Sequence, residues 1–235
     1  MTIDVLLTGF APFDGAARNE SWDAVRLAAA ALTDNSPSSP LSDSSDESDT
    51  AASAGAASPT STPLSVQILE LPVEFGAAGD ALVAAVRDHR PRLAIAVGLA
   101  AGRRAITPER VAINIQDARI PDNAGEQPVD RPVVAGGPVG YFSTLPVKAM
   151  VHAVHTGLDL SASVSQTAGT FVCNDVFYRL QHELATSPGP TRGGFIHVPA
   201  HADLAVEDTA RALAHMIRTA LTTDTDLQVT GGSVH

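Results

Sequence analysis

Short apolar runs alternate with amphipathic segments along most of this chain. The apolar runs predict strands at residues 3–8, 64–71, 93–97, 110–115, 162–165 and 194–198. Between them, apolar residues recur every three or four positions and predict helices at residues 21–32, 77–89, 144–156, 171–183 and 203–222. Strands that alternate with helices are typical of an α/β protein. We expect a single-domain, three-layer α/β/α sandwich around a mostly parallel, twisted central sheet.

Three segments depart from this alternation. Residues 34–63 are rich in Ser, Pro and acidic residues and hold no Lys or Arg, so we expect a disordered surface insertion there. Residues 117–140 are rich in Pro, Gly and Asp and indicate a long ordered loop. The polar tail over 223–235 is expected to fray. No linker divides the remainder, so residues 1–235 are expected to form one domain.

Charge and composition narrow the function classes. The formal net charge is −11, which argues against nucleic-acid binding, because that function favours a basic face. No apolar run approaches the roughly 20 residues that a membrane-spanning helix needs. The first residues include no basic segment, so no signal peptide is expected. The single cysteine excludes an intrachain disulfide. Together these features favour a soluble, cytoplasmic protein.

Two residues stand out as candidates for nucleophilic chemistry. Cys173 lies where a turn passes into a predicted helix, and a helix N-terminus favours a thiolate. His197 lies near the carboxyl end of an apolar predicted strand, the place where α/β sheets bind ligands. Each could instead be a packed core residue. A cysteine hydrolase also needs a group to orient the imidazole, and Glu109 or Asp117 could serve.

Other chemistries lack their motifs. The chain has no CxxC, HExxH, phosphate-binding loop or G-x-S-x-G pattern, so neither a metal nor a cofactor is expected. Arg119 lies between two aspartates, where it could be an ion-pair partner or a cation of the site.

Several strings taken together resemble one known family. They are TGFAPFDG, GRRAITPERVAIN, DARIPDN, YFSTLP, AGTFVCN and GGFIHVP, in this order. The set is similar to pyroglutamyl-peptidase I, also called pyrrolidone-carboxylate peptidase, a family of cysteine peptidases. The resemblance covers residues 3–199 apart from the insertion. It implies a cysteine exopeptidase that removes N-terminal pyroglutamyl residues from peptides through an acyl-thioester intermediate.

The resemblance also implies roles for particular residues. Glu109, Cys173 and His197 match the catalytic triad of the family. Arg119 matches an arginine that supports the site. Residues implied to form the substrate pocket are Phe10, Phe13, Leu99, Ile120, Phe171 and Val172, with Leu99 acting through its backbone. Members of the family are usually homotetramers, so a homo-oligomer is expected.

Two alternatives stay open at this point. The chain could be another thiol-dependent amidase that acts on a small acyl amide through the same triad. It could also be a catalytically silent binding protein of the same fold.

Overall fold

The computed structural model describes residues 3–34 and 62–232, so most of the predicted insertion lies outside the described residues. The strands are β1 (Val5–Phe10), β2 (Val66–Leu71), β3 (Leu93–Leu99), β4 (Thr107–Pro108), β5 (Val111–Ile113), β6 (Gly140–Phe142) and β7 (Arg192–Val198). The helices are α1 (Glu20–Thr33), α2 (Ala77–His89), α3 (Val147–Leu158), α4 (Val172–Thr186) and α5 (Val206–Thr222).

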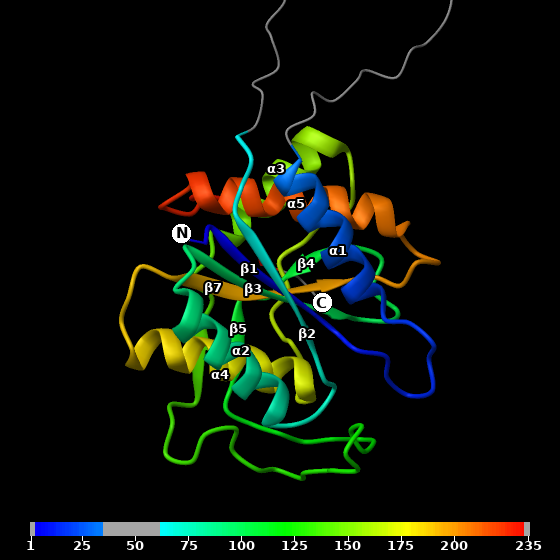
Figure 1. The fold of residues 1–235 in the computed structure, drawn as a ribbon, viewed down its shortest axis with the longest axis vertical. Coiled ribbons are helices and arrows are strands. Elements are labelled where there is room, and N and C mark those ends of the chain that lie inside the picture. The colour runs from blue at the N-terminus through cyan, green and yellow to red at the C-terminus, as the bar shows by residue number, and fades with distance from the viewer. Residues whose placement is uncertain (1–2, 35–61, 233–235) are drawn as a thin grey trace, which may run out of the picture.

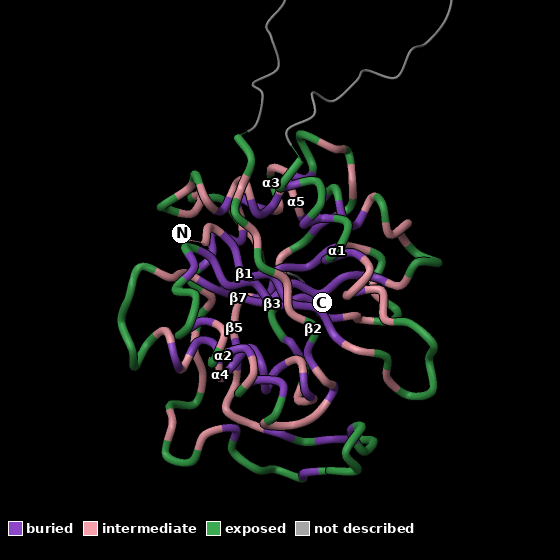
Figure 2. Tube along the Cα trace, viewed as in Figure 1, coloured by how far each residue is buried: buried purple, intermediate pink, exposed green. Residues whose placement is uncertain are grey.

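A five-stranded sheet forms the centre of the molecule, in the order β2-β1-β3-β7-β4. Strands β2, β1, β3 and β7 are parallel, and the two-residue edge strand β4 is antiparallel to β7. The central strands are buried along almost their whole length (Figure 2). Strands covered on both faces carry apolar residues without alternation, which is the pattern that predicted them. The mostly parallel sheet of the sequence prediction is therefore confirmed.

Helices cover both faces of this sheet (Figure 1). Helices α1, α3 and α5 pack on one face, where Leu213 and Met216 of α5 lie in a core with Leu7 and Ile95 of the sheet. Helices α2 and α4 pack on the other face, over a second core that contains Phe195. The sheet thus separates two hydrophobic cores, and the predicted three-layer arrangement is confirmed.

Two predicted strands differ from the structure. Residues 110–115 contain β5, but β5 pairs with β6 in a separate two-stranded sheet instead of joining the central one. Residues 162–165 make only single bridges, from Ala162 to Ile106 and from Ser165 to Glu109. The local apolar pattern favoured an extended chain in both places, but it does not specify the pairing partner.

Two predicted boundaries are wrong. The strand predicted over 93–97 continues as β3 through Leu99, and Gly98 pairs with His197 of β7. Thr144 lies before α3, which begins at Val147, although the helix was predicted from residue 144. Thr144 exchanges hydrogen bonds with the backbone of Gly193, donating from Oγ1 to the carbonyl oxygen and accepting from the N–H. This tie to β7 takes the hydroxyl away from the helix, and Pro146 occupies the N-cap position.

Residues 223–232 of the C-terminal tail make hydrogen bonds to the rest of the molecule. The carboxylate of Asp226 accepts hydrogen bonds from the backbone N–H groups of Lys148 and Ala149, at 3.1 and 2.9 Å. The carbonyl oxygen of Gly231 accepts from Arg110. Helix α3 has no side-chain cap of its own, so Asp226 supplies from a distance the acceptor that the first turn of a helix requires.

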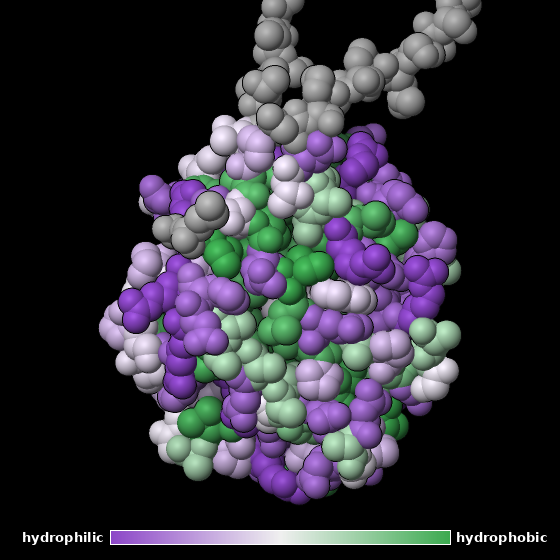
Figure 3. Space-filling model, viewed as in Figure 1, coloured by the Kyte–Doolittle hydropathy of each residue, from purple (hydrophilic) through white to green (hydrophobic). Residues whose placement is uncertain are grey.

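Edge strand β2 carries part of the surface of the molecule. Figure 3 shows hydrophobic side chains gathered along the middle of this face, where Val66, Ile68 and Leu69 of β2 are only partly buried. No helix in the described parts of the chain is both long enough and apolar enough to cross a membrane.

Candidate active site

Cys173 is the second residue of α4, at the end of the helix that faces the carboxyl edge of the sheet. The first N–H groups of a helix have no partner within the helix and carry the positive end of its dipole. The thiol is only partly covered and is the single free cysteine of the chain. The predicted placement of Cys173 at a helix start is therefore present in the structure.

The two residues after Cys173 hold the start of α4 in place. The side chain of Asn174 accepts a hydrogen bond from the N–H of Ile113 and donates to the carbonyl oxygens of Ile113 and Ile115. Asp175, also buried, accepts from the N–H of Gly76 and from Gln116. A helix start tied to strand β5 and to the loop before α2 presents the sulfur in one defined position.

The sulfur lies directly over Gly98. A Cβ atom at Gly98 would lie 2.9 Å from Cys173 Sγ and 2.8 Å from the ring of Phe195. Gly98 is the neighbour of His197 in the parallel β3–β7 register. In adjacent parallel strands, paired residues project to the same face of the sheet, so the sulfur and the imidazole share one face. The sequence analysis missed Gly98, although a glycine inside an apolar strand is a signal for close approach.

His197 and Glu109 meet inside the protein. His197 Nδ1 lies 2.7 Å from Glu109 Oε1, and both side chains are buried. A carboxylate can only accept a hydrogen bond, so Nδ1 carries the proton and Nε2 is the basic nitrogen of the ring. The structure brings Glu109 to the imidazole and leaves Asp117, the other candidate, exposed in the loop after β5.

Burial controls the protonation of both reactive groups. It raises the pKa of the Cys173 thiol to about 12, and the negative charge of Glu109 adds to that rise. It also lowers the pKa of His197, while the hydrogen bond and charge of Glu109 act in the opposite direction. Burial therefore disfavours the charged form of each group, the thiolate of Cys173 and the imidazolium of His197.

Arg103 is a member of the site that the sequence analysis did not assign. Its Nη1 donates to Glu109 Oε1 at 2.7 Å and to Thr107 Oγ1 at 2.6 Å, and its Nη2 donates to the carbonyl oxygen of Thr167 at 2.9 Å. The sequence shows several arginines in this stretch, but no spacing rule identifies which one folds back onto Glu109.

Three half-buried phenylalanines lie together beside the start of α4. The ring of Phe171, the residue before the helix, is 5.4 Å from Phe13 and 5.2 Å from Phe75, centroid to centroid. Phe13 comes from the loop after β1 and Phe75 from the loop after β2. Phe75 was not predicted, because only the folded chain brings its loop to Phe171.

The long loop over 117–140 is ordered and ties these aromatic residues together. Asp122, which is buried, accepts a hydrogen bond from the N–H of Phe75 at 2.8 Å. Asn123 donates to the carbonyl oxygens of Val73 and Pro12, at 3.0 and 3.1 Å. The loop therefore fixes the segments that carry Phe13 and Phe75 relative to each other.

The remaining candidates occupy different environments. Phe10 is buried in the core, with its ring 6.4 Å from that of Phe195. Leu99 ends β3 beside Gly98 and is partly exposed. Val172 is buried in the first turn of α4. Arg119 and Ile120 are exposed on the long loop, whose residue Asp117 exchanges hydrogen bonds with Thr170 just before the helix. Their roles in the pocket stay predictions.

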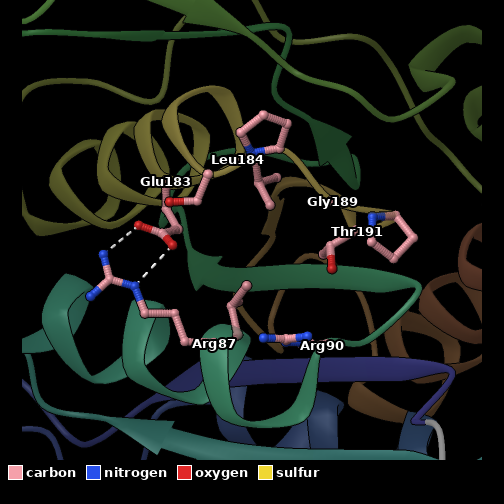
Figure 4. Close-up of a pocket in the computed structure, with 10 residues that line it drawn as sticks. Arg87, Arg90, Glu183, Leu184, Gly189 and Thr191 are labelled. Atoms are coloured by element: carbon pink, nitrogen blue, oxygen red, sulfur yellow. Dashed lines mark hydrogen bonds and ion pairs between the residues drawn. The ribbon is translucent and has the colours of Figure 1, made fainter.

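A cavity of about 620 Å³ lies at the opposite end of α4 (Figure 4). It is lined by the last turns of α2 and α4, with an Arg87–Glu183 ion pair on one side and Thr191 on the other. Helix α4 has 15 residues, so about 20 Å separates this cavity from Cys173. Neither Cys173, His197 nor Glu109 lines this cavity. Among the described residues, no group of His, Cys, Asp and Glu could hold a metal ion.

The arrangement identifies a class of enzyme. A cysteine at a helix N-terminus lies on the same edge and face of the sheet as an imidazole that a buried carboxylate orients, and this set of groups is typical of cysteine hydrolases. Here it stands at the carboxyl edge of a parallel sheet, where α/β proteins bind their substrates.

Comparison with known proteins gives the family. The profile of the family described as pyroglutamyl peptidase matches residues 54–226. The pyrrolidone-carboxylate peptidase of Clavibacter michiganensis is 45% identical over 239 residues, which cover 98% of each chain. The enzyme of the same name from Streptomyces coelicolor is 45% identical over 242 residues, covering 98% of this chain and 99% of the other.

Solved structures agree. Pyroglutamyl peptidase I from Bacillus amyloliquefaciens superposes with a TM-score of 0.78 at 36% identity, covering 98% of this chain and 100% of that one. A mutant pyrrolidone carboxyl peptidase from Pyrococcus furiosus has a TM-score of 0.73 at 33% identity, covering 93% and 98%. The chain belongs to the pyroglutamyl peptidase family.

The absence of a side chain at Gly98 leaves the space that Cys173 Sγ occupies, and a substitution at this position tests that packing. The Gly98→Ala substitution places a methyl group against Cys173 Sγ and the Phe195 ring, so we expect the free energy of unfolding to fall by about 1–3 kcal/mol. The displaced sulfur should also lower kcat. Urea unfolding and steady-state kinetics measure the two effects. Gly232→Ala, at an exposed glycine with no neighbouring atom within 4 Å of an added Cβ, should leave kcat unchanged. Wild-type kcat in Gly98→Ala would contradict the placement of the sulfur.

Proposed function

We propose that Cys173, His197 and Glu109 are the nucleophile, the general acid–base and the orienting carboxylate that remove N-terminal pyroglutamyl residues from peptides. The observation that carries this proposal is the 2.7 Å contact between His197 Nδ1 and Glu109 Oε1, on the same sheet edge and face as the sulfur. Membership of the family supplies the reaction, and the geometry supplies the candidates for each step.

The first half of the reaction forms a thioester. His197 Nε2 accepts the thiol proton while Cys173 Sγ attacks the carbonyl carbon that follows the lactam ring. The tetrahedral intermediate collapses with cleavage of the C–N bond, and His197 passes the proton to the departing amine. The Glu109 carboxylate stabilises the imidazolium that exists between these two transfers.

The second half regenerates the enzyme. His197, neutral again, removes a proton from a water molecule that attacks the thioester carbonyl. Collapse of this second intermediate breaks the C–S bond, releases pyroglutamate and returns the proton to the sulfur. The unpaired N–H groups at the start of α4 are the nearest donors for the oxyanion of both intermediates, and one such donor typically contributes about 3–4 kcal/mol.

The lactam ring requires a small apolar slot with a few polar groups. Phe13 and Phe171, whose rings are 5.4 Å apart, supply half-buried aromatic faces next to the nucleophile. The backbone of Leu99, at the end of β3, is our candidate for the group that bonds the lactam amide. Candidates for the remaining walls and for support of the site are Phe10, Arg119, Ile120 and Val172.

An activity panel tests the proposal. We expect release of a fluorophore from a pyroglutamyl amide but not from prolyl or alanyl amides. Cys173→Ser should reduce kcat to background, because an alcohol beside a neutral imidazole is a much weaker nucleophile than a thiol. EDTA should have no effect. Turnover of all three amides would indicate a broader thiol amidase, and no turnover by folded wild-type protein would indicate a silent binding protein.

The pH profile follows from the protonation of Cys173 and His197. His197 must be neutral to accept the thiol proton, and its pKa is lowered from 6.5 by burial. As the pH falls, kcat/KM should therefore drop with a midpoint below 6.5. The pKa of the thiol is about 12, so its ionisation should impose no alkaline limit below about pH 10. Initial rates in constant-ionic-strength buffers measure the profile. An acid midpoint above 6.5 would contradict the assignment.

We further propose that the enzyme acts in the cytoplasm as a homotetramer. A lone cysteine suits a reducing compartment. Val139 and Phe142, which are 91% and 73% exposed at the β6 turn, supply apolar surface for contact between copies. Light scattering after gel filtration should give about four times the mass of the chain, and Phe142→Ser should shift it toward smaller species. A monomer at all concentrations would contradict this assembly.

A further inference from the structure

Arg103 lies behind the catalytic row, in the loop after β3. Its guanidinium donates three hydrogen bonds, to Thr107, to Glu109 and to the backbone of Thr167. Its side chain is 29% exposed, whereas that of Glu109 is fully buried. Arg103 is therefore a partly exposed side chain that is hydrogen-bonded to a carboxylate with no exposure of its own.

The two oxygens of the Glu109 carboxylate differ in their hydrogen bonding. Oε1 accepts from both Arg103 Nη1 and His197 Nδ1, each at 2.7 Å. Oε2 is buried and has no hydrogen-bond partner among the described residues. A buried charge needs a compensating charge nearby. Of the two side chains bound to Oε1, Arg103 is the one that is always a cation, so it meets this need.

We propose that Arg103 is a positioning residue that holds the Glu109 carboxylate against His197 and offsets its negative charge. This inference rests on the proposed function, because it assigns Arg103 a part in the proton transfer. Arg103 reaches the substrate only through Glu109 and His197.

Two charged side chains act on His197, Glu109 from the segment after β4 and Arg103 from the loop after β3. The thiol of Cys173 on α4 is a third titratable group on the same face of the sheet, but it carries no charge that shifts the pKa of His197. The charge of Glu109 raises the pKa of His197, and the charge of Arg103 lowers it. Arg103 also lowers the pKa of Cys173, which Glu109 raises. Removing the charge of Arg103 leaves Glu109 unopposed, and the pKa of His197 then rises.

A purely structural role makes a different prediction. Through Thr167, Arg103 also ties down the segment before the nucleophile, and loss of that bond alone would lower activity at every pH equally. A lysine restores the charge but not the planar fork that reaches Thr107, Glu109 and Thr167 together. Lysine and an uncharged residue at position 103 therefore separate charge from scaffolding.

The experiment compares Arg103→Met and Arg103→Lys with Arg104→Met. Arg104 is the adjacent residue, with a side chain that is 90% exposed and 3.8 Å from Asp203, so its variant loses the same charge outside the site. Two readouts are measured from pH 4 to 9. One is kcat/KM on a pyroglutamyl amide. The other is the rate at which iodoacetamide alkylates Cys173, the single thiol, followed by mass spectrometry.

We expect Arg103→Met to lower kcat about 10- to 100-fold with little change in KM, the usual cost of losing an outer partner of a catalytic group. The acid midpoint of both readouts should rise by about 1 pH unit, the effect of a nearby charge on a titrating group. Arg103→Lys should return the midpoint close to the wild-type value. Arg104→Met should match wild type in both.

Three outcomes would overturn the inference. They are an unmoved midpoint in Arg103→Met, an equal shift in Arg104→Met, or no return of the midpoint in Arg103→Lys. Thermal melts check folding. If Arg103→Met does not fold, Arg103→Gln replaces it as the uncharged variant. Absent turnover by wild type would instead refute the proposed function, while the alkylation profile would still test Arg103.

Discussion

The buried contact between Glu109 and His197 is the interaction on which the rest of the site depends. It joins a carboxylate beside the antiparallel edge strand β4 to an imidazole on the neighbouring strand β7. Taking a charge out of water is costly unless a partner remains at hydrogen-bond distance. The sheet supplies that distance through its register, and Arg103 supplies the opposite charge from the loop after β3. The imidazole is thereby fixed in one tautomer and one orientation.

Cys173, the proposed nucleophile, lies in a different layer from this pair. It belongs to α4, whose start is anchored by Asn174, bound to β5, and by Asp175, bound to the loop before α2. Gly98 leaves the space on the sheet that the sulfur occupies. Burial disfavours both the thiolate of Cys173 and the imidazolium of His197. The same packing that places the sulfur therefore also opposes its ionisation.

The aromatic cluster beside the nucleophile depends on the long loop more than on any strand. Asp122 and Asn123 bind the backbone of the segments that carry Phe75 and Phe13. A slot assembled from loops is held by backbone hydrogen bonds, because loop side chains alone bury too little apolar area to fix its shape. The loop that looked irregular in the sequence thus organises the surroundings of the nucleophile.

The sequence by itself predicted the layers of the fold and the candidate catalytic residues. Apolar periodicity predicted the central strands and the helices, because the spacing of apolar residues within an element shows which of its faces is buried. The motifs around Glu109, Cys173 and His197 indicated the chemistry. Only the tertiary structure decided that β5 leaves the central sheet, that Asp226 caps α3, and that Arg103, Gly98 and Phe75 join the site. Each of these features depends on a partner that is distant along the chain. A local sequence pattern indicates the conformation and burial that a residue favours, but it does not indicate which distant residue folding brings to it.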